Sequence, residues 1–582
     1  MTDRTATKLP PISSPSYWPV EKLLRQVGRS TGSWADLGGK PLSKAASLPL
    51  QLKPVVASVS WDLLEKLDMS SDQRQELREA LLWALPSPVN DKLKSLVPCI
   101  VRVPSHRISA ADAALYVAAN KLKVSTADTT PIAWCNFFTR AEWEKIPPRR
   151  RGLLEPMVND AIRHDSDTGP PLNYTVSYTR KDDIRRAVMT SELAASADMT
   201  SWFDQLPMPG CESMMGVEDD EGRQYSLQVA AMGYMPSCKV AQAALGAIDP
   251  ACPRLALTAK FVDNIAFFGN DNEPENAMAL FKARAKRCGA KINDEDNSAR
   301  TSLDFLGEHY DLLNKTRSLT EKSVKKLARI QEILDRFSGK IEAKMTCRLF
   351  MAIIGSLLYC GEVLAVDLSK KTAALRCHAE AAAEAGRLQS WDHKILVGAS
   401  AVSQLMQWTR ECLVNNPVHV TNGRSTPSAE GMNDTSSVTL WVDASAWGWG
   451  AVILGSGSSS ARHISQPWSD ADRHEAERQG GYLASSVFAE PLAVRRALCA
   501  VTLRPGQRIE VWSDHLSLVC AAQGGYSLVE SYNAAISLLR DIGASLSFIP
   551  GASNPADSLS RGQPPLLRVT KIGDAPAAAM YG

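Results

Sequence analysis

Four acidic residues in the C-terminal third of the sequence lie beside predicted strands and helices. Asp443 lies in WVDAS near the end of a strand-like segment, and Asp514 ends the strand-like VWSD. Glu490 lies in VFAEPLAV at a predicted helix start, where Pro491 suits the first helical position. Asp557 follows the last strand-like segment, in NPADSLSR. Acids placed in this way can converge on one edge of a sheet, where they repel one another unless cations neutralise them.

A cluster of this kind would support phosphodiester chemistry. Two divalent ions would neutralise the acids and would hold the attacking and leaving oxygens of the reacting phosphate. The alternative for any single acid is a helix cap or a solvated loop residue. The residue pattern alone leaves both alternatives open.

A second set of acids lies in the middle of the sequence. Asp198 lies in ASADMTSWFDQLPMP, and Asp263 lies in FVDNIAFFG beside Asn264. The second segment reads as an apolar strand that two polar residues interrupt at its centre. Burying an unpaired carboxylate costs several kcal/mol, so Asp263 is a candidate functional residue.

The elements that position these acids follow from periodicity and turn signals. Residues 70–85 read as a helix. Further on, one apolar helix face is predicted by residues at three- and four-residue steps, Val324, Leu327, Ile330 and Leu334. Beyond the Gly-, Ser- and Pro-containing segment 421–437, the order strands, helix, strand, helix, strand predicts a compact α/β domain.

Composition sets the class of protein. The 582 residues suffice for several domains, and 45% hydrophobic with 22% charged residues is ordinary for a globular protein. The formal net charge of +2 gives no sign of nucleic-acid binding, so any basic surface has to be local.

The cysteines and apolar runs indicate the compartment. The 12 cysteines are scattered without a CxxC pair, which suits free thiols in a reducing compartment. The N-terminal segment lacks the apolar core of a secretory signal. The run Leu349–Gly361 has 13 residues, which is short for a membrane span and typical of a buried helix. We expect an intracellular protein, cytoplasmic or nuclear, without a membrane partner.

The C-terminal motifs together resemble a known family. VDASAWGWGAV, SSVFAEPLAVRRAL, VWSDH and IPGASNPADSLSR occur in the order of the four motifs of a retroelement ribonuclease H domain. The last resembles the retrotransposon signature V-x-G-x-x-N-x-x-A-D-x-L-S-R. The resemblance implies that Asp443, Glu490, Asp514 and Asp557 are the metal-binding acids, with spacings of 47, 24 and 43 residues. The sequence departs from many family members in lacking a His shortly before Asp557.

The middle of the sequence resembles the motifs of reverse transcriptases. Asp198, Phe203 and Pro207 fit motif A, which reads D-x-x-x-x-[FY]-x-x-[IVL]-P. Motif C normally carries two aspartates; Asp263 fits the first, and Asn264 replaces the second. Because the first acid does most of the metal ligation in this family, we expect Asn264 to be tolerated.

Further matches and one mismatch flank these motifs. Gly233 and Gln242 fit motif B in AAMGYMPSCKVAQ, and Arg149 and Arg151 fit the [KR]-x-R pattern of the fingers. The alternative for the arginines is a solvated basic run. Where the family carries the motif D lysine, this sequence has Glu295 and Asp296, which leaves Lys291 as the alternative.

The resemblance implies a fold and a domain order. The fold class would be multidomain α/β and α+β, with a right-hand polymerase, a helical connection and a ribonuclease H-like α/β domain. The implied parts are an N-terminal extension of unknown role (1–105), fingers and palm (106–312), thumb and connection (313–420), a linker (421–437), ribonuclease H (438–566) and a tail (567–582). Motifs B and C are closer to DIRS-like and VIPER-like retrotransposons than to retroviral enzymes.

The resemblance also implies roles for single residues. Two Mg²⁺ or Mn²⁺ ions per active site would be held by the two sets of acids, with the Met199 carbonyl completing one shell in the polymerase. Phe203 would lie under the sugar and select deoxynucleotides. Gly233 would let the backbone approach the nucleotide, Gln242 would support the motif B helix, and Arg149 and Arg151 would bind the triphosphate.

The implied activity is RNA-directed DNA synthesis with degradation of RNA in the hybrid. The partners would be an RNA template, a DNA primer, dNTPs and the RNA–DNA hybrid. Two alternatives stay open: a domesticated or decayed polymerase that acts as an RNA-binding scaffold, and a protein in which only the ribonuclease H is active.

Overall fold

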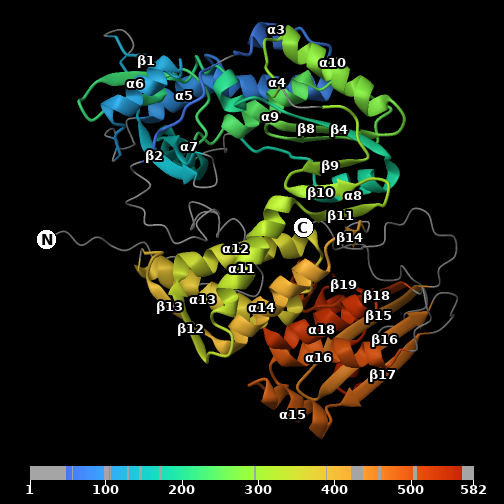
Figure 1. Ribbon diagram of the computed structural model, residues 1–582. Coiled ribbons are helices and arrows are strands. Elements are labelled where there is room, and N and C mark those ends of the chain that lie inside the picture. Colours follow the sequence, from blue (N-terminus) through green and yellow to red (C-terminus); the bar gives the residue numbers. More distant parts are fainter. Residues whose placement is uncertain are drawn as a thin grey trace. The chain divides into compact units, whose positions relative to one another are not determined.

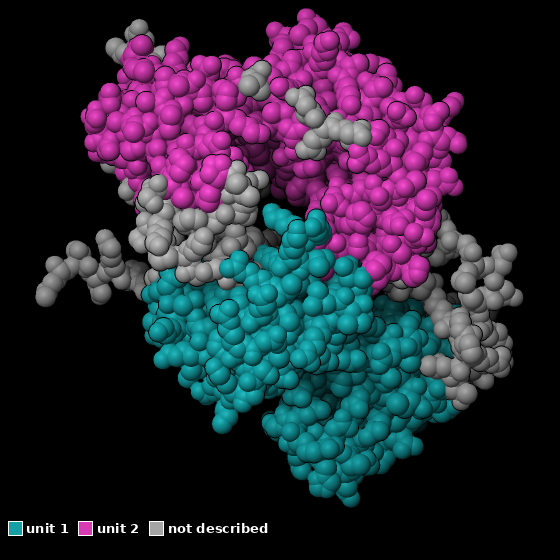
Figure 2. Space-filling view, viewed as in Figure 1, with its two compact units in different colours: residues 1–37, 321–416, 424–582 teal, residues 38–320, 417–423 magenta. Residues whose placement is uncertain are grey.

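The structure is a computed structural model that describes residues 48–565, apart from residues 56, 98–103, 105, 127–129, 143–146, 169–173, 294–296, 389, 421–436, 456–460 and 502–507. Most of the predicted linker 421–437 therefore lies outside the described residues, as do the predicted tail 567–582 and the first 47 residues of the predicted N-terminal extension. The chain divides into two compact units (Figure 2). Unit 2 holds residues 38–320 and 417–423, and unit 1 holds the rest.

Unit 2 combines helices with a central three-stranded sheet (Figure 1). Its helices are α3 (Trp61–Glu65), α4 (Ser71–Ala84), α5 (Pro88–Leu96), α6 (Ala110–Ala118), α7 (Val158–Thr168), α8 (Lys181–Thr190), η4 (Trp202–Gln205), η5 (Glu212–Met214), α9 (Ser237–Ile248) and α10 (Glu273–Arg287). The helix predicted over 70–85 is confirmed as α4. It begins with a capping box, in which Ser70 and Gln73 exchange side-chain bonds to each other's backbone N–H groups.

The central sheet of unit 2 has the antiparallel order β4-β8-β7, formed by β4 (Leu193–Asp198), β8 (Asn264–Gly269) and β7 (Leu257–Phe261). Side chains of β8 alternate between two faces. Ile265 and Phe267 pack with α9 and α10, whereas Ala266 and Phe268 pack with α8. The sheet is thus covered by helices on both faces, and its strand ends are the places left for polar residues.

The segment FVDNIAFFG is a hairpin and not the single interrupted strand that the apolar pattern suggested. β7 ends at Phe261, Val262 and Asp263 form the turn, and β8 begins at Asn264. Val262 has φ of 57°, which is rare for a β-branched residue. Positive φ at the first position of a two-residue turn matches the twist of the flanking strands. The polar residues interrupt the apolar run because the chain reverses there.

The remaining strands of unit 2 form three small sheets. One has the order β1-β6-β5, one is the hairpin β2-β3, and one has the order β14-β11-β10-β9. Their bounds are β1 (Leu122–Val124), β2 (Cys135–Glu142), β3 (Arg149–Pro156), β5 (Gly216–Glu218), β6 (Gln224–Leu227), β9 (Ser302–Phe305), β10 (Glu308–Asp311), β11 (Thr316–Leu319) and β14 (Val418–His419).

Unit 1 begins with a helical part. It contains α11 (Glu321–Asp335), α12 (Cys347–Val363), η6 (Leu368–Lys370), α13 (Thr372–Leu388), α14 (Ala399–Val414), and the two-stranded sheet of β12 (Glu342–Thr346) and β13 (Lys394–Gly398). Leu327, Ile330 and Leu334 of the predicted apolar face are buried in α11. The apolar run 349–361 is confirmed as a buried helix, α12. Among the helices that the structure describes, none has the length and apolarity to cross a bilayer.

The rest of unit 1 is a mixed five-stranded sheet with helices. The sheet has the order β17-β16-β15-β18-β19, in which β15 pairs parallel with β18 and β18 with β19. Its strands are β15 (Ser437–Ala444), β16 (Gly448–Gly455), β17 (Arg462–Pro467), β18 (Arg508–Ser513) and β19 (Ser545–Phe548). Its helices are α15 (Asp470–Arg478), α16 (Ser486–Cys499), α17 (Leu516–Gly524), α18 (Glu530–Asp541), η7 (Gly551–Ser553) and α19 (Asp557–Ser560). The predicted order of strands, helix, strand, helix and strand is present, but the prediction lacked the helices α15, before α16, and α17, after β18.

The prediction that Glu490 lies at a helix start was wrong. α16 begins at Ser486, so that Glu490 and Pro491 both lie inside it. Pro491 has no N–H for the carbonyl of Val487, one turn earlier. The Ser531 hydroxyl of α18 donates to that carbonyl at 2.7 Å. A side chain distant in sequence thus satisfies the carbonyl that Pro491 leaves open, and the helix continues.

Candidate active sites

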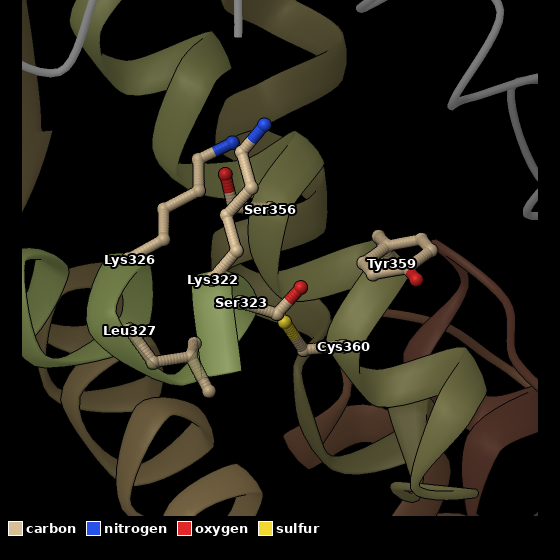
Figure 3. Close-up of a pocket in the computed structure, with 7 residues that line it drawn as sticks. All are labelled: Lys322, Ser323, Lys326, Leu327, Ser356, Tyr359 and Cys360. Carbon is tan, nitrogen blue, oxygen red and sulfur yellow. The ribbon is translucent and has the colours of Figure 1, made fainter. Parts of the chain in front are cut away.

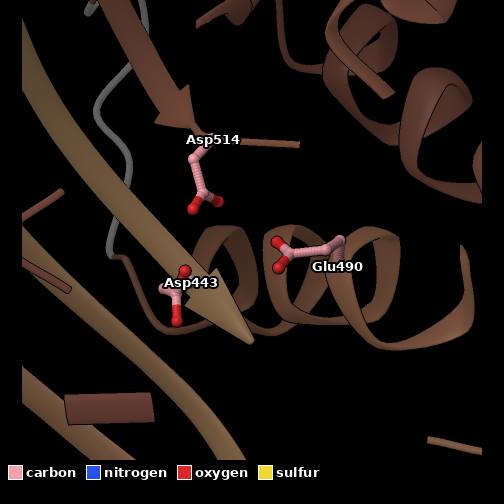
Figure 4. Close-up of side chains that lie close together, drawn as sticks. All are labelled: Asp443, Glu490 and Asp514. Atoms are coloured by element: carbon pink, nitrogen blue, oxygen red, sulfur yellow. The ribbon is translucent and has the colours of Figure 1, made fainter. Parts of the chain in front are cut away.

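Three acids of unit 1 meet at one edge of the mixed sheet (Figure 4). Asp443 lies near the end of β15 and Asp514 follows the end of its parallel neighbour β18, so both carboxylates emerge at the same sheet edge. Glu490 reaches this edge from α16, which packs on the sheet. One carboxylate oxygen from each residue lies within 4.8 Å of the others.

Burial raises the free-energy cost of charge in this three-acid cluster. Asp443 and Glu490 are only 3% and 5% exposed. Asp443 Oδ2 and Glu490 Oε2 have no hydrogen-bond partner among the described residues. Burial, reinforced by the neighbouring carboxylates, raises the pKa of Asp443 to about 7 and raises the pKa values of Glu490 and Asp514 as well. Oxygen ligands that lack a partner, at a site of concentrated negative charge, fit a hard divalent cation such as Mg²⁺ or Mn²⁺.

The fourth predicted acid, Asp557, lies beside this cluster and is not one of its members. It begins α19, and its carboxylate accepts a 2.8 Å hydrogen bond from Arg561. Its charge is near enough to contribute to the raised pKa values of Asp443 and Asp514. The structure therefore brings three of the four acids together and gives the fourth a cationic partner.

Asn554 is a residue of this site that the sequence reasoning missed. Its buried amide donates to the Val442 carbonyl at 3.0 Å and contacts Asp443 Oδ1 at 3.5 Å. Its Oδ1 accepts from the Ala556 N–H at 3.1 Å. Asn554 thus ties the segment before Asp557 to the strand that carries Asp443. The motif NPAD could have indicated Asn554, but a role was assigned only to its acid, Asp557.

In unit 2, Asp198 and Asp263 lie at the same end of the central sheet. Asp198 is the last residue of β4 and stands opposite Asn264, the first residue of β8. The N–H of Met199 donates to the Asp263 carbonyl at 2.8 Å, which holds the two segments together. Burial raises the pKa of Asp263, and the Asn264 amide donates to Asp263 Oδ1 at 2.9 Å. Two carboxylates and nearby backbone carbonyls form an all-oxygen donor set, which also fits Mg²⁺ or Mn²⁺.

The two residues predicted from motif B contact different elements: Gln242 contacts the hairpin β7-β8, and Gly233 lies against the strand β3. Gln242, on α9, accepts from the Val262 N–H at 2.7 Å and donates to the Lys260 carbonyl at 3.3 Å. It therefore holds the strained turn that carries Asp263, in addition to being part of the helix. A Cβ on Gly233 would lie 2.7 Å from the Leu154 carbonyl oxygen of β3, so this position requires glycine.

The two arginines predicted to bind triphosphate share one carboxylate. On the hairpin β2-β3, Arg149 Nε lies 2.5 Å and Arg151 lies 3.0 Å from the carboxylate of Glu142. Both arginines alternate with Arg150, which pairs with Asp112 instead. Sequence reasoning missed Glu142 because the pairing depends on hairpin register, in which Glu142 stands opposite Arg149.

Met199 and Phe203 follow Asp198 closely in the sequence. Phe203 is in the short helix η4 and packs partly buried against the core, while the Met199 side chain is fully buried and leaves only its backbone for ligation. Of the motif D candidates, Glu295 and Asp296 lie outside the described residues. Lys291 lies in the segment beside Asp198, where its backbone bonds to Thr200 and Gln205.

A pocket of about 300 Å³ lies between α11 and α12 in unit 1 (Figure 3). Lys322 and Lys326 line it, with Ser356 and Tyr359 from α12. Burial lowers the pKa of Lys326 to about 8. Lys325, the preceding residue of α11, is instead exposed and paired with Glu321 at 2.6 Å. The two neighbouring lysines thus face different surroundings.

Comparison with known proteins gives structural neighbours only. No protein-family model matches the chain, and no curated protein matches it. A foamy viral protease-reverse transcriptase in complex with double-stranded DNA aligns over 93% of this chain and 84% of its own, with 12% identity and a TM-score of 0.40. A foamy viral protease-reverse transcriptase in complex with an RNA/DNA hybrid aligns over 89% of this chain and 67% of its own, with 13% identity and a TM-score of 0.39. Because TM-scores this low do not establish a shared fold, the residues of the two sites have to carry any functional proposal.

Proposed function

We propose that the protein is an RNA-directed DNA polymerase with ribonuclease H activity. The observation that carries the proposal is a pair of separate carboxylate sites, one in each compact unit. Each site lies where the reverse transcriptase or ribonuclease H motifs fall in the sequence. A scaffold that only binds RNA has no need for one buried and one partly buried set of acids, since burying charge without a compensating cation costs free energy.

In the polymerase site, Asp198 and Asp263 would hold the divalent ions, together with the Met199 carbonyl. Bound ions of this kind lower the pKa of the attacking hydroxyl and stabilise the charge of the transferred phosphate. The chain itself supplies the geometry. Gln242 fixes the turn that carries Asp263, and the Met199 N–H holds this turn against the end of β4.

Substrate contacts would come from the hairpin β2-β3 and from η4. Arg149 and Arg151 present guanidinium groups on one face of β3, suited to bidentate contact with phosphates. Their common partner Glu142 would compete with the triphosphate for them. Phe203 would lie against the sugar and exclude a 2′-hydroxyl, the group that distinguishes RNA from DNA precursors.

In the ribonuclease H site, Asp443, Glu490 and Asp514 would hold the ions, and Asp557 would complete the set when its contact with Arg561 opens. Both sites would recognise the backbone and the A-like shape of the hybrid, because neither depends on base edges. The substrate class is therefore RNA paired with DNA, without sequence preference.

The finer assignments belong to the same proposal. Fingers and palm would span 106–312, thumb and connection 313–420, and ribonuclease H 438–566, in a DIRS-like or VIPER-like retrotransposon enzyme that acts in the cytoplasm or nucleus. The alternative with active ribonuclease H alone draws on one observation, which is that the three acids of unit 1 cluster whereas unit 2 presents two acids and Asn264.

The test is primer extension by the purified full chain. An RNA template, a DNA primer, dNTPs and Mg²⁺ should yield extended DNA, and Asp263→Ala should abolish extension. Hybrid cleavage without any extension by the unmodified chain would favour the protein in which only the ribonuclease H is active. Absence of both activities would favour the RNA-binding scaffold.

A further inference from the structure

Asn293 makes a direct contact with the first acid of the polymerase site. Its amide Nδ2 donates to Asp198 Oδ2 at 2.6 Å. Its Oδ1 accepts from the Thr200 hydroxyl at 2.9 Å, which fixes the orientation of the amide. A short bond from an oriented amide to a carboxylate is among the stronger hydrogen bonds in proteins.

The backbone of the segment that carries Asn293 is held at Lys291 and at Asn293 itself. The Asn293 N–H donates to the Asp198 carbonyl at 2.9 Å, and the Thr200 N–H donates to the Lys291 carbonyl at 3.1 Å. The Gln205 side chain bonds to both backbone groups of Lys291, at 2.9 and 2.7 Å. Asn293 therefore reaches Asp198 from a fixed backbone, which is the requirement for a residue that orients another.

The second acid has an equivalent partner. Asn264 Nδ2 donates to Asp263 Oδ1 at 2.9 Å. Each carboxylate of the pair thus receives one side-chain amide, from different segments of the chain. An amide donor satisfies one carboxylate oxygen without adding charge, whereas a third acid would add repulsion.

We propose that Asn293 is a positioning residue that orients Asp198 for divalent metal binding, with Asn264 in the same role for Asp263. The proposal rests on the polymerase function proposed above. Groups that hydrogen-bond to metal-ligating carboxylates set the orientation of the ligand, and their loss typically weakens metal affinity or activity about 10- to 100-fold. Asn293 lies two residues before Glu295, in a segment where the family resemblance pointed only to a missing lysine.

The test measures metal binding directly. Mn²⁺ binding to the full chain is followed by electron paramagnetic resonance, with Asp443→Asn and Glu490→Gln present in all samples to silence the unit 1 site. Asn293→Leu keeps the side-chain volume and removes the donor. Asn276→Ala, at an exposed position of α10, is the matched control. We expect Asn293→Leu to weaken Mn²⁺ binding about 10- to 100-fold and the control to leave it unchanged.

A graded variant guards against loss of folding. Thr200→Val keeps Asn293 and removes only the bond that orients its amide, so it should weaken Mn²⁺ binding by a smaller factor. Melting temperature, and hybrid cleavage in the chain with an intact unit 1 site, report folding separately. If Asn293→Leu fails to fold, unchanged Mn²⁺ affinity in Thr200→Val overturns the proposal.

The outcomes separate this proposal from the proposed function. Unchanged Mn²⁺ affinity in a folded Asn293→Leu chain overturns the positioning role, whether or not the parent extends primers. Weakened Mn²⁺ affinity in a chain whose parent extends no primer supports the positioning role and contradicts the polymerase function. Absence of Asp263-dependent Mn²⁺ binding in the parent overturns both.

Discussion

Replacing Asp443 by Asn should stabilise unit 1 in the absence of metal while abolishing hybrid cleavage. Asp443 is almost fully buried, one of its oxygens has no partner, and two other carboxylates lie near it. The substitution removes the charge and nearly preserves the shape. A residue kept for function at a cost in stability should behave in this way.

The magnitude follows from the pKa of Asp443. Burial raises this pKa to about 7, against about 3.9 in an unfolded chain. Between these values the folded protein binds more protons than the unfolded chain, so the free energy of unfolding falls as pH rises. The full difference corresponds to about 4 kcal/mol at pH 8. The Asn amide that replaces the carboxylate is also buried without partners, which costs about 1–3 kcal/mol. The substitution should therefore raise the free energy of unfolding by about 2 kcal/mol at pH 8.

The assay is calorimetric melting of the full chain in EDTA at pH 8 and pH 5. For a unit of this size, about 2 kcal/mol raises the melting temperature by about 4–8 °C. At pH 5 folded Asp443 is protonated, but the unfolded chain still ionises, so the destabilisation falls to about 1.5 kcal/mol. The cost of the buried Asn amide offsets this remainder, so the Asp and Asn chains should melt close together. Added Mg²⁺ should stabilise unit 1 only in the unmodified chain, because ligand binding to the folded state raises its stability, whereas the unit 2 site is intact in both chains.

The matched control is Asp557→Asn, which removes a half-exposed carboxylate paired with Arg561. An exposed pair contributes at most about 1 kcal/mol, so this control should melt within about 2–4 °C of the unmodified chain at both pH values. A lower melting temperature for Asp443→Asn at pH 8 in EDTA would refute the reasoning, since it would mean that the buried charge is compensated.

Three further predictions concern unit 2. Asn264→Asp should keep primer extension within about tenfold of the unmodified chain at saturating Mg²⁺. At limiting Mg²⁺ the loss of extension should exceed tenfold, because repulsion replaces the hydrogen bond from the Asn264 amide to Asp263. An equal loss at both Mg²⁺ concentrations would count against a role for that hydrogen bond. Glu142→Gln should lower the KM for dNTPs several-fold with little change in kcat, because it frees the two arginines paired with it; a raised KM would show that the carboxylate positions them for binding. Gly233→Ala should lower the unfolding free energy by about 1–3 kcal/mol in thermal melting, because the added Cβ meets the β3 backbone. Gly246 on α9 has space for a Cβ, so Gly246→Ala should be neutral or stabilising. Equal melting temperatures of the two variants would refute the contact at Gly233.

The features that sequence predicted well are those with local signals. The helix α4 is marked by its capping box, and the apolar face of α11 by residues at helical spacing. Asp443 and Asp514 are each marked by a strand that ends at an acid. In all three cases the deciding residues lie within a few positions of one another, where periodicity and capping act.

The features that sequence missed depend on tertiary contacts. Pro491 lies inside α16 because Ser531, from another helix, satisfies the carbonyl that it leaves open. Glu142 and Asn293 were not singled out because their partners are defined by hairpin register and by a segment 95 residues away. The pairing of Asp557 with Arg561 had a readable signal, since the two are four residues apart in a helical turn.

The measurement that tests the central claim most directly is a single reaction in which both strands are followed. A labelled RNA template annealed to a labelled DNA primer, with dNTPs and Mg²⁺, reports extension and RNA cleavage at once. Two independent carboxylate sites predict that Asp263→Ala loses extension and keeps cleavage, while Asp443→Asn loses cleavage and keeps extension. Loss of both activities in either variant, or of neither, would contradict the account.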